Sequence, residues 1–325
     1  CKVYQKVWGN SKLKILDISF NRLKDLSESL GQLFNLESFN APYNLLEALI
    51  GFHVFNKKLL AFHLVILGLI FQVGFRLKMT TQFCSLNSIS NTMPSWLPKL
   101  PPMITYLNIS YNQISGKIQD FLDNNVGPVV IDFSSNNFSR PLPRFSQLVG
   151  KLHVDNNQFF GSLNSICKIR SSTTLDLFEN LLSGEILDCW TLMSVPIILN
   201  IANNRISGSI PYSLCSSTSL SSLYVRNNNL SGQFPVSLKK CQGLKVLDLG
   251  RNTLSGKIPE WIGTKLAYLG ILSLRFNEFS EIIPPSICQL QSIRYRTFLA
   301  TIYLEELHIA SAISPHCNFC KMVQV

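Results

Sequence analysis

The most constraining feature of the sequence is an asparagine that returns about every 24 residues. Between Asn112 and Asn277, the asparagines that close an apolar-x-apolar-x-x-Asn pattern follow one another at steps of 24, 21, 23, 24, 24, 24 and 25 residues. A fixed period of this length is typical of repeat proteins, in which each unit buries its apolar side only against its neighbours. A length of 325 residues would favour two domains of roughly 150 residues in a globular chain. The period predicts a stack of coils instead.

The positions around each asparagine repeat as well, as the stretch Leu247–Pro259 shows. Apolar residues stand five and three positions before Asn252 and two after it, and this alternation predicts a short strand with one buried face. A Ser-Gly pair and then an Ile-Pro pair follow, which predict a tight turn and a short 3₁₀ helix on the outer side. We expect each repeated asparagine to hydrogen-bond backbone groups of a buried turn and to form a ladder from coil to coil.

These residues carry a resemblance to a known family. The stretch Leu247–Pro259 resembles the plant-type leucine-rich repeat. The stretches 183–190 and 276–290 resemble the extracellular part of plant leucine-rich-repeat receptor-like proteins, especially the fungal-xylanase-receptor group. The likeness covers residues 85–290 well and 13–44 more loosely. It implies a repeat solenoid, a right-handed leucine-rich-repeat β/3₁₀ superhelix with a parallel inner sheet and about eleven to twelve repeats.

The pattern predicts a solenoid over residues 1–290, with degraded repeats at 45–82, and a non-repeat tail at 291–325. Leu59–Phe75 is an almost wholly apolar run of 17 residues, whereas a membrane-spanning helix needs about 20. A degraded repeat is favoured over a membrane span, because the repeat resumes in phase beyond it. The chain opens at Cys1 without a visible leader and ends without an anchor, which we expect of a fragment or a processed form.

Composition and motifs argue against an enzyme. The net charge is +10, but the Lys and Arg residues are scattered, so no nucleic-acid surface is predicted. Cys288 and Arg294 have the spacing of a phosphatase loop, yet they fall on an outer turn without a glycine-rich cradle. Cys317 and Cys320, with histidines nearby, form at most half of a zinc site. We therefore predict no catalytic residue, no metal ligand and no cofactor.

Cysteines and glycosylation sequons bear on the compartment. Cys167 and Cys189 occupy similar positions in neighbouring coils, so a disulfide between them is one possibility, although buried free thiols are favoured. Sequons at Asn108, Asn137 and Asn229 fit a secreted glycoprotein. A glycan on Asn108 would lie on the inner strand face.

Ligand binding is predicted on the strand residues that point away from the core. These stand four, two and one positions before each asparagine, where we expect the fold not to fix the side chain. Aromatic and arginine side chains are common binding hot spots, and the arginines would face acidic groups; for any single residue, a merely solvated surface is the alternative. The candidates are Phe178, Tyr224, Arg226, Asp248, Arg251, Arg275 and Phe276.

The resemblance implies a function at the cell surface. It implies a non-enzymatic ectodomain, secreted or on the extracellular side of the plasma membrane, that senses microbial or peptide ligands in plant defence. Its expected partners are a protein, peptide or glycan ligand on the concave face and a co-receptor kinase that signals, with no nucleic acid and a membrane contact only through an anchor. A secreted protein similar to polygalacturonase inhibitors, or an inactive decayed receptor copy, remains an alternative.

Overall fold

The computed structural model describes residues 13–24, 38–46, 81–83, 89–90, 92–93, 106–120, 129–170, 172–190, 196–216 and 219–290. By backbone contacts the chain divides into two compact units, Cys1–Phe160 and Gly161–Val325. The predicted apolar run Leu59–Phe75 and the tail 291–325 lie outside the described residues. The division into a solenoid and a tail therefore stays a prediction.

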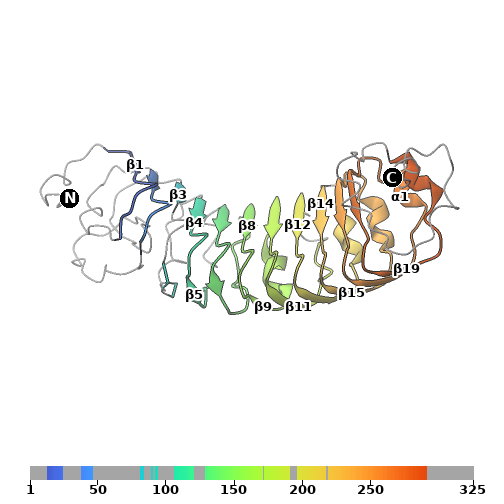
Figure 1. The fold of residues 1–325 in the computed structure, drawn as a ribbon, viewed down its shortest axis with the longest axis horizontal. Coiled ribbons are helices and arrows are strands. Elements are labelled where there is room, and N and C mark those ends of the chain that lie inside the picture. The colour runs from blue at the N-terminus through green and yellow to red at the C-terminus, as the bar shows by residue number, and fades with distance from the viewer. Residues whose placement is uncertain are drawn as a thin grey trace, which may run out of the picture. The chain divides into compact units, whose positions relative to one another are not determined.

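The first unit holds a parallel sheet with one strand from each coil (Figure 1). Its strands, in order, are β1 (Ile15–Asp17), β2 (Ser38–Asn40), β3 (Thr81–Phe83), β4 (Tyr106–Asn108), β6 (Val130–Asp132) and β8 (Lys151–His153). The sheet passes directly from β2 to β3, with Ser38 opposite Thr81. The degraded repeats predicted for 45–82 fall mostly on residues outside the described part and stay a prediction.

Short strands of the first unit form a second row. β5 (Ser115–Gly116) pairs in parallel with β7 (Asn137–Phe138), and β9 (Phe160–Gly161) falls on the boundary between the units. The buried alternation that precedes each asparagine fills the core between the two rows. Leu107, Ile109, Ile131 and Phe133 are all at most 3% exposed.

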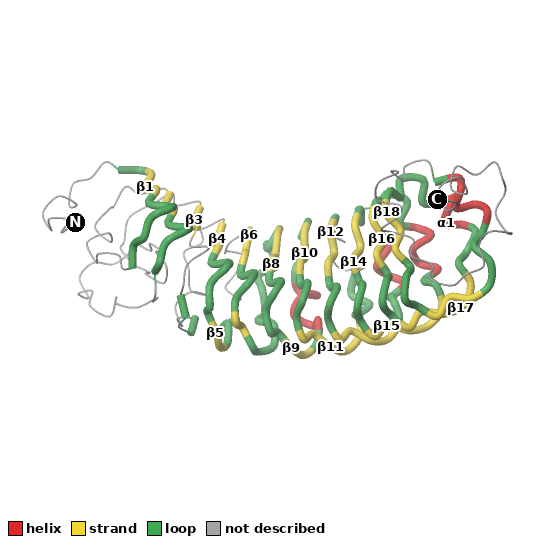
Figure 2. The backbone as a smooth tube through the Cα atoms, viewed as in Figure 1, coloured by secondary structure: helices red, strands yellow, loops and turns green. Residues whose placement is uncertain are grey.

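The second unit repeats this plan with longer second-row strands. Its first row is β10 (Thr174–Asp176), β12 (Ile198–Asn200), β14 (Ser222–Tyr224), β16 (Val246–Asp248) and β18 (Ile271–Ser273). Its second row is β11 (Leu181–Glu185), β13 (Arg205–Gly208), β15 (Asn229–Gln233), β17 (Thr253–Lys257) and β19 (Glu278–Ser280). Figure 2 shows the two rows as separate series of strands.

Short helices form the outer turns of the second unit, and all but the first of them follow a Pro residue that predicted them. They are the 3₁₀ helices η4 (Leu163–Lys168), η5 (Tyr212–Cys215), η6 (Val236–Lys240) and η7 (Pro285–Gln289) and one α-helical turn, α1 (Trp261–Lys265). Pro211, Pro235 and Pro284 each stand at the position before such a helix, in extended backbone. The outer 3₁₀ helices are thus confirmed for these repeats.

The asparagine ladder is confirmed. In Asn252, Nδ2 donates to the carbonyl oxygens of Leu249 (3.0 Å) and Gly250 (3.2 Å) in its own turn and of Val225 (3.0 Å) in the preceding coil. Its Oδ1 accepts the backbone N–H of Leu230, also in the preceding coil, at 3.0 Å. Each such side chain therefore closes its own turn and joins two coils, and losing it should cost about 1–3 kcal/mol. The same set of contacts occurs at Asn44, Asn136, Asn157, Asn204, Asn228 and Asn277.

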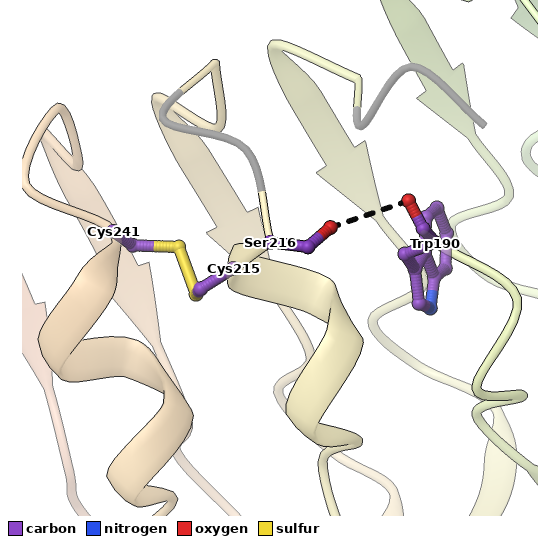
Figure 3. The surroundings of a disulfide bond; sticks show 4 residues. All are labelled: Trp190, Cys215, Ser216 and Cys241. Atoms are coloured by element: carbon purple, nitrogen blue, oxygen red, sulfur yellow. Dashed lines mark hydrogen bonds between the residues drawn. A yellow bond between two sulfur atoms is a disulfide. The ribbon is translucent and has the colours of Figure 1, made fainter. Parts of the chain in front are cut away.

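Disulfides join neighbouring outer turns of the second unit. Cys167 bonds Cys189, and Cys215 at the end of η5 bonds Cys241 just beyond η6 (Figure 3). The pairing of Cys167 with Cys189 is thus confirmed, and the preference for buried free thiols is wrong for these four residues. The reason is geometric, since the stacking brings equivalent positions of adjacent coils to Cα–Cα distances of 5.8 and 5.2 Å, which suit a disulfide.

Candidate functional site

Three adjacent coils of the second unit bring most of the predicted ligand-binding residues together. In the parallel register, Tyr224 on β14 lies beside Asp248 on β16, which lies beside Ser273 on β18. Strand alternation turns these side chains away from the core, into which the leucines between them point. We call the residues four, two and one positions before the ladder asparagines of the second unit its open face.

A second line of open-face residues follows the strand ends. The backbone N–H of Asn227 donates to the carbonyl oxygen of Gly250 (2.8 Å), and that of Arg251 donates to the carbonyl oxygen of Arg275 (2.8 Å). These bonds continue the sheet register into the turns and place Arg226, Gly250 and Arg275 in one line across three coils. Both arginines are half-buried.

The last residue before each ladder asparagine adopts a left-handed backbone. Arg251 has φ of 53° and Phe276 has φ of 54°. The conformation recurs at equivalent positions in both units, so it belongs to the turn that the asparagine closes and is not a special strain of this site. The other examples are Phe20, Tyr43, Tyr111, Ser135, Asn156, Glu179, Asn203 and Asn227.

An aromatic ring with two guanidinium groups lies at the C-terminal end of the open face. Phe276 is 50% exposed. The Arg251 guanidinium carbon lies 4.8 Å from the centre of its ring, and that of Arg275 lies 5.8 Å from it. Both distances are within the range of cation–π attraction, so the exposed ring is held by charged neighbours.

Positive charge gathers around Arg226. Burial is the main cause that lowers the pKa of its guanidinium, and the positive charge of Arg275 lowers it further. The carboxylate of Asp248 works in the opposite direction, and Arg251 adds a smaller repulsion. Three arginines and one carboxylate thus influence one another, and the surface here favours an anionic partner.

Asp248 also has a structural task that the sequence analysis missed. Its Oδ1 accepts the backbone N–H of Gly250 at 3.1 Å. An Asp or Asn four positions before the ladder asparagine makes the same contact in other coils, so the expectation that the fold leaves this column free is wrong. The repeated Asp/Asn in that column was the available signal. The equivalent acceptors are Asp17, Asn108, Asp132, Asp176 and Asn200.

Phe178 lies apart from the other candidates. It follows β10, and the coil of β12 lies between it and the coil of β14. Two strand spacings, about 10 Å, therefore separate its backbone from that of Arg226. Phe178 is half-buried, and its backbone N–H donates to Asp176. The structure groups six of the seven candidates and leaves this one at a distance.

Gly250 is a site residue that sequence reasoning did not select. A Cβ atom here would lie 3.1 Å from Oγ of Ser273 and 3.3 Å from Cγ of Arg275. Because Gly250 has no side chain, the side chain of Arg275 has room to lie against it. The available signal was a glycine between two arginines in one column of the repeat.

The three sequons differ in exposure. Asn137 on β7 and Asn229 on β15 are exposed, in the second rows of their units. Asn108 is 8% exposed, and its Oδ1 accepts hydrogen bonds from the N–H and the hydroxyl of Ser110. Glycosylation stays a prediction at all three, and the geometry favours Asn137 and Asn229.

Two further sequence features can be placed. Cys288 is disulfide-bonded, so its sulfur is not the free thiol that a phosphatase loop needs. Cys317 and Cys320 lie outside the described residues. Among the helices that the structure describes, none has the length and hydropathy to cross a membrane.

Models of the leucine-rich repeat family match several parts of the chain. They match residues 218–279, residues 103–125 and 197–217, and residues 9–26. Each stretch lies in or beside coils whose asparagines repeat with the same period. The matches agree with the parallel strand rows of both units.

Curated relatives are plant receptor-like proteins. The chain is 40% identical to "Receptor-like protein EIX2" of Solanum lycopersicum over 208 residues, which are 63% of this chain and 20% of that protein. It is 54% identical to "Receptor-like protein EIX1" of the same plant over 59 residues, 18% of this chain and 6% of that protein. "Receptor-like protein 32" of Arabidopsis thaliana is 36% identical over 124 residues, 35% of this chain and 14% of that protein. The chain thus spans a fifth or less of each of these relatives.

Solved receptor structures share the fold. A TDR receptor superposes with a TM-score of 0.65 and 22% identity, covering 87% of this chain and 50% of that one. The peptide hormone receptor RGFR1 in complex with RGF2 gives 0.63 and 22%, covering 87% and 50%. PEPR1–AtPEP1 gives 0.63 and 22%, covering 87% and 44%.

The rows of parallel strands, the ladder and these matches define a leucine-rich-repeat solenoid. The sequence relatives narrow the class further, and they support a plant leucine-rich-repeat receptor-like protein.

Proposed function

We propose that this chain belongs to the ligand-sensing ectodomain of a plant receptor-like protein, and that the open face of its second unit binds the ligand. The observation that supports this most is the half-exposed Phe276 ring held by two guanidinium groups. An apolar ring facing solvent serves no purpose in the core, whereas rigid aromatic and arginine groups are frequent anchors in binding interfaces.

The similar proteins support a proteinaceous ligand. The peptide hormone receptor RGFR1 is solved in complex with RGF2, PEPR1 is solved with AtPEP1, and the receptor kinase HAESA is solved with the peptide hormone IDA and a co-receptor. A parallel sheet surface such as the open face suits an extended peptide or a protein edge. The ligand proposed here is therefore a microbial or plant peptide or protein with acidic groups, and a glycan is the less favoured choice.

The proposed role is recognition without catalysis. The ectodomain would act at the plasma membrane on its extracellular side, in defence, and a co-receptor kinase would supply the signal. The disulfides Cys167–Cys189 and Cys215–Cys241 fit an oxidising extracellular compartment. The exposed sequons at Asn137 and Asn229 fit the same compartment.

The test is a binding assay on the chain secreted from plant cells. The probes are a purified fungal xylanase, other secreted fungal proteins and synthetic acidic peptides, measured by biolayer interferometry. For a probe that binds, replacing Arg226, Arg251 and Arg275 together by Gln should weaken binding at least tenfold. Arg205→Gln is the matched control, because Arg205 is exposed on β13 in the second row.

Two results would contradict the proposal. One is that no probe of the panel binds the secreted chain. The other is that a bound probe keeps its affinity in the triple variant or loses it equally in the Arg205→Gln control.

A further inference from the structure

We propose that the open face holds one oxyanion group of the ligand (a carboxylate, phosphate or sulfate) between the guanidinium groups of Arg226 and Arg275, above Gly250. The inference deepens the proposed function and rests on it, since the oxyanion belongs to the ligand bound there. It assigns different tasks to the three arginines, which a general basic surface would not do.

We call the space above Gly250, between Arg226 and Arg275, the notch. The backbone register forms it. Arg226, Gly250 and Arg275 lie in one line across three adjacent coils, because the bonds from Asn227 N–H to Gly250 and from Arg251 N–H to Arg275 extend the sheet. Two strand spacings separate the backbones of the arginines by about 10 Å. Two arginine side chains on either side of a glycine can reach the same small anion above it.

The glycine directs one of these side chains. A Cβ atom here would lie 3.3 Å from Cγ of Arg275, so the stem of Arg275 lies against Gly250, in the coil between the two arginines. A side chain at 250 would push this stem away. Gly250 is therefore a positioning residue for the site.

The charges favour an anion at this point. The guanidinium of Arg226 is half-buried and experiences the positive charge of Arg275 more strongly than that of Arg251. Asp248 compensates only part of this charge, and its Oδ1 already accepts the Gly250 N–H. An oxyanion between the two guanidinium groups relieves their repulsion and accepts paired N–H bonds in the geometry that guanidinium forks prefer.

Arg251 has a different partner. Its guanidinium lies 4.8 Å over the ring of Phe276, which is closer than that of Arg275 at 5.8 Å. Arg251 is also exposed, whereas Arg226 and Arg275 are half-buried. It is thus assigned to holding the aromatic contact and not to the oxyanion.

The experiment measures stabilisation of the whole chain by anions. Thermal unfolding is followed in increasing sulfate, with sodium chloride at equal ionic strength as the reference, and acetate and phosphate in parallel arms to identify the preferred oxyanion. Ligands that bind the folded state raise the unfolding temperature in a saturable way. Arg226→Gln and Arg275→Gln should each weaken the apparent affinity about tenfold, the size expected for a charge-assisted contact. Arg251→Gln and Arg205→Gln should leave it unchanged.

A second variant tests the notch without changing any charge. Gly250→Ala should displace Arg275 and weaken sulfate at least threefold, with circular dichroism confirming the fold. The inference is overturned if all variants respond to sulfate like the unchanged chain, or if Arg251→Gln loses as much as Arg226→Gln. Such a result leaves probe capture by the open face intact, so the failure of this inference is distinguishable from failure of the proposed function.

Discussion

The first and second units share the asparagine ladder and differ in the length of their second-row strands. Asn136 in the first unit and Asn252 in the second make the same four hydrogen bonds, three to carbonyl oxygens and one from a backbone N–H. The second rows differ, since β5 and β7 have two residues each and β15 and β17 have five. The ladder is thus the element common to both units, whereas the length of the second-row strands varies from coil to coil.

The residue four positions after the asparagine does not by itself explain this difference, because Gly116 in the two-residue β5 also has a positive φ, of 85°. Gly232 and Gly256, in long second-row strands, have φ of 92° and 81°. Arg140 stands at the same place in the coil of β7 and does not adopt a positive φ, and that strand is short. Glu281 does adopt one, at 66°, next to the three-residue β19. A side chain here therefore leads either to another backbone path or to a strained one.

The open faces differ in charge as well. In the first unit the corresponding described positions carry small polar and acidic residues such as Ser110, Asp132 and Asp155, and exposed aromatic rings at Phe20, Tyr43 and Tyr111, but no arginine. In the coils of β14, β16 and β18 they carry arginines and an exposed phenylalanine. Because the scaffold is the same, the arginines are what distinguishes the surface proposed here for binding from the corresponding positions of the first unit.

Removing a disulfide should give the largest effect, and it should lower the stability of the second unit and leave that of the first unchanged. Replacing Cys215 and Cys241 by Ala is expected to destabilise the second unit by about 3 kcal/mol, since the bond closes a sequence separation of 26 residues. Guanidinium chloride unfolding, with hydrogen exchange to separate the units, measures the loss. A loss spread equally over both units would contradict a local effect.

Breaking the ladder should cost nearly as much and should do so in both units. Asn252→Ala and Asn136→Ala each remove four hydrogen bonds at a buried side chain, and each is expected to cost about 2–3 kcal/mol. The control is Asn164→Ala, at an exposed position of η4, which should change stability by less than about 0.5 kcal/mol. If Asn136→Ala proved harmless, the ladder would not be the common element of the two units.

Substitutions at the glycine position of the second-row turns should have the next largest effect on stability. Gly232→Ala should cost about 1–2 kcal/mol, and the cause is the backbone alone, because a Cβ there would have no atom within 4 Å. Glu281→Gly should stabilise by about 0.5–1 kcal/mol for the converse reason, less the small contribution of its surface pair with Lys257 at 2.9 Å. Thermal unfolding compares the two, and equal signs would contradict the account.

The smallest expected effect concerns an ion pair of the first unit. Burial raises the pKa of Asp120, but hydrogen bonds from the backbone and side chain of Arg144 outweigh it and hold the pKa below its usual value. A lowered folded-state pKa gives stability that is present above the unfolded-state value and lost as the pH falls through the folded-state value. Asp120→Asn should therefore cost about 0.5–1 kcal/mol at pH 7 and nothing at about pH 2. A cost that does not change between these pH values would exclude the ion pair as the cause.

The sequence predicted the parts of this fold that depend on a repeated side chain. The period located the strands, the ladder and the outer 3₁₀ helices, because each is determined by residues within one coil. Several features were not predicted, because they arise from contacts between coils or from backbone shape. Examples are the left-handed residue before each asparagine and the closeness of Arg275 to Gly250, a glycine in the preceding coil. The disulfide between Cys215 and Cys241 was likewise decided by stacking.

The central claim, that the open face of the second unit is the binding surface, is tested most directly by a hydrogen-exchange footprint. The measurement compares the secreted chain with and without the probe that it captures. We predict slowed exchange at 222–228, 246–252 and 271–277 and unchanged exchange at 106–112 and 130–136. Protection of the first-unit strands or of the second-row strands, with no change at β14, β16 and β18, would contradict the account.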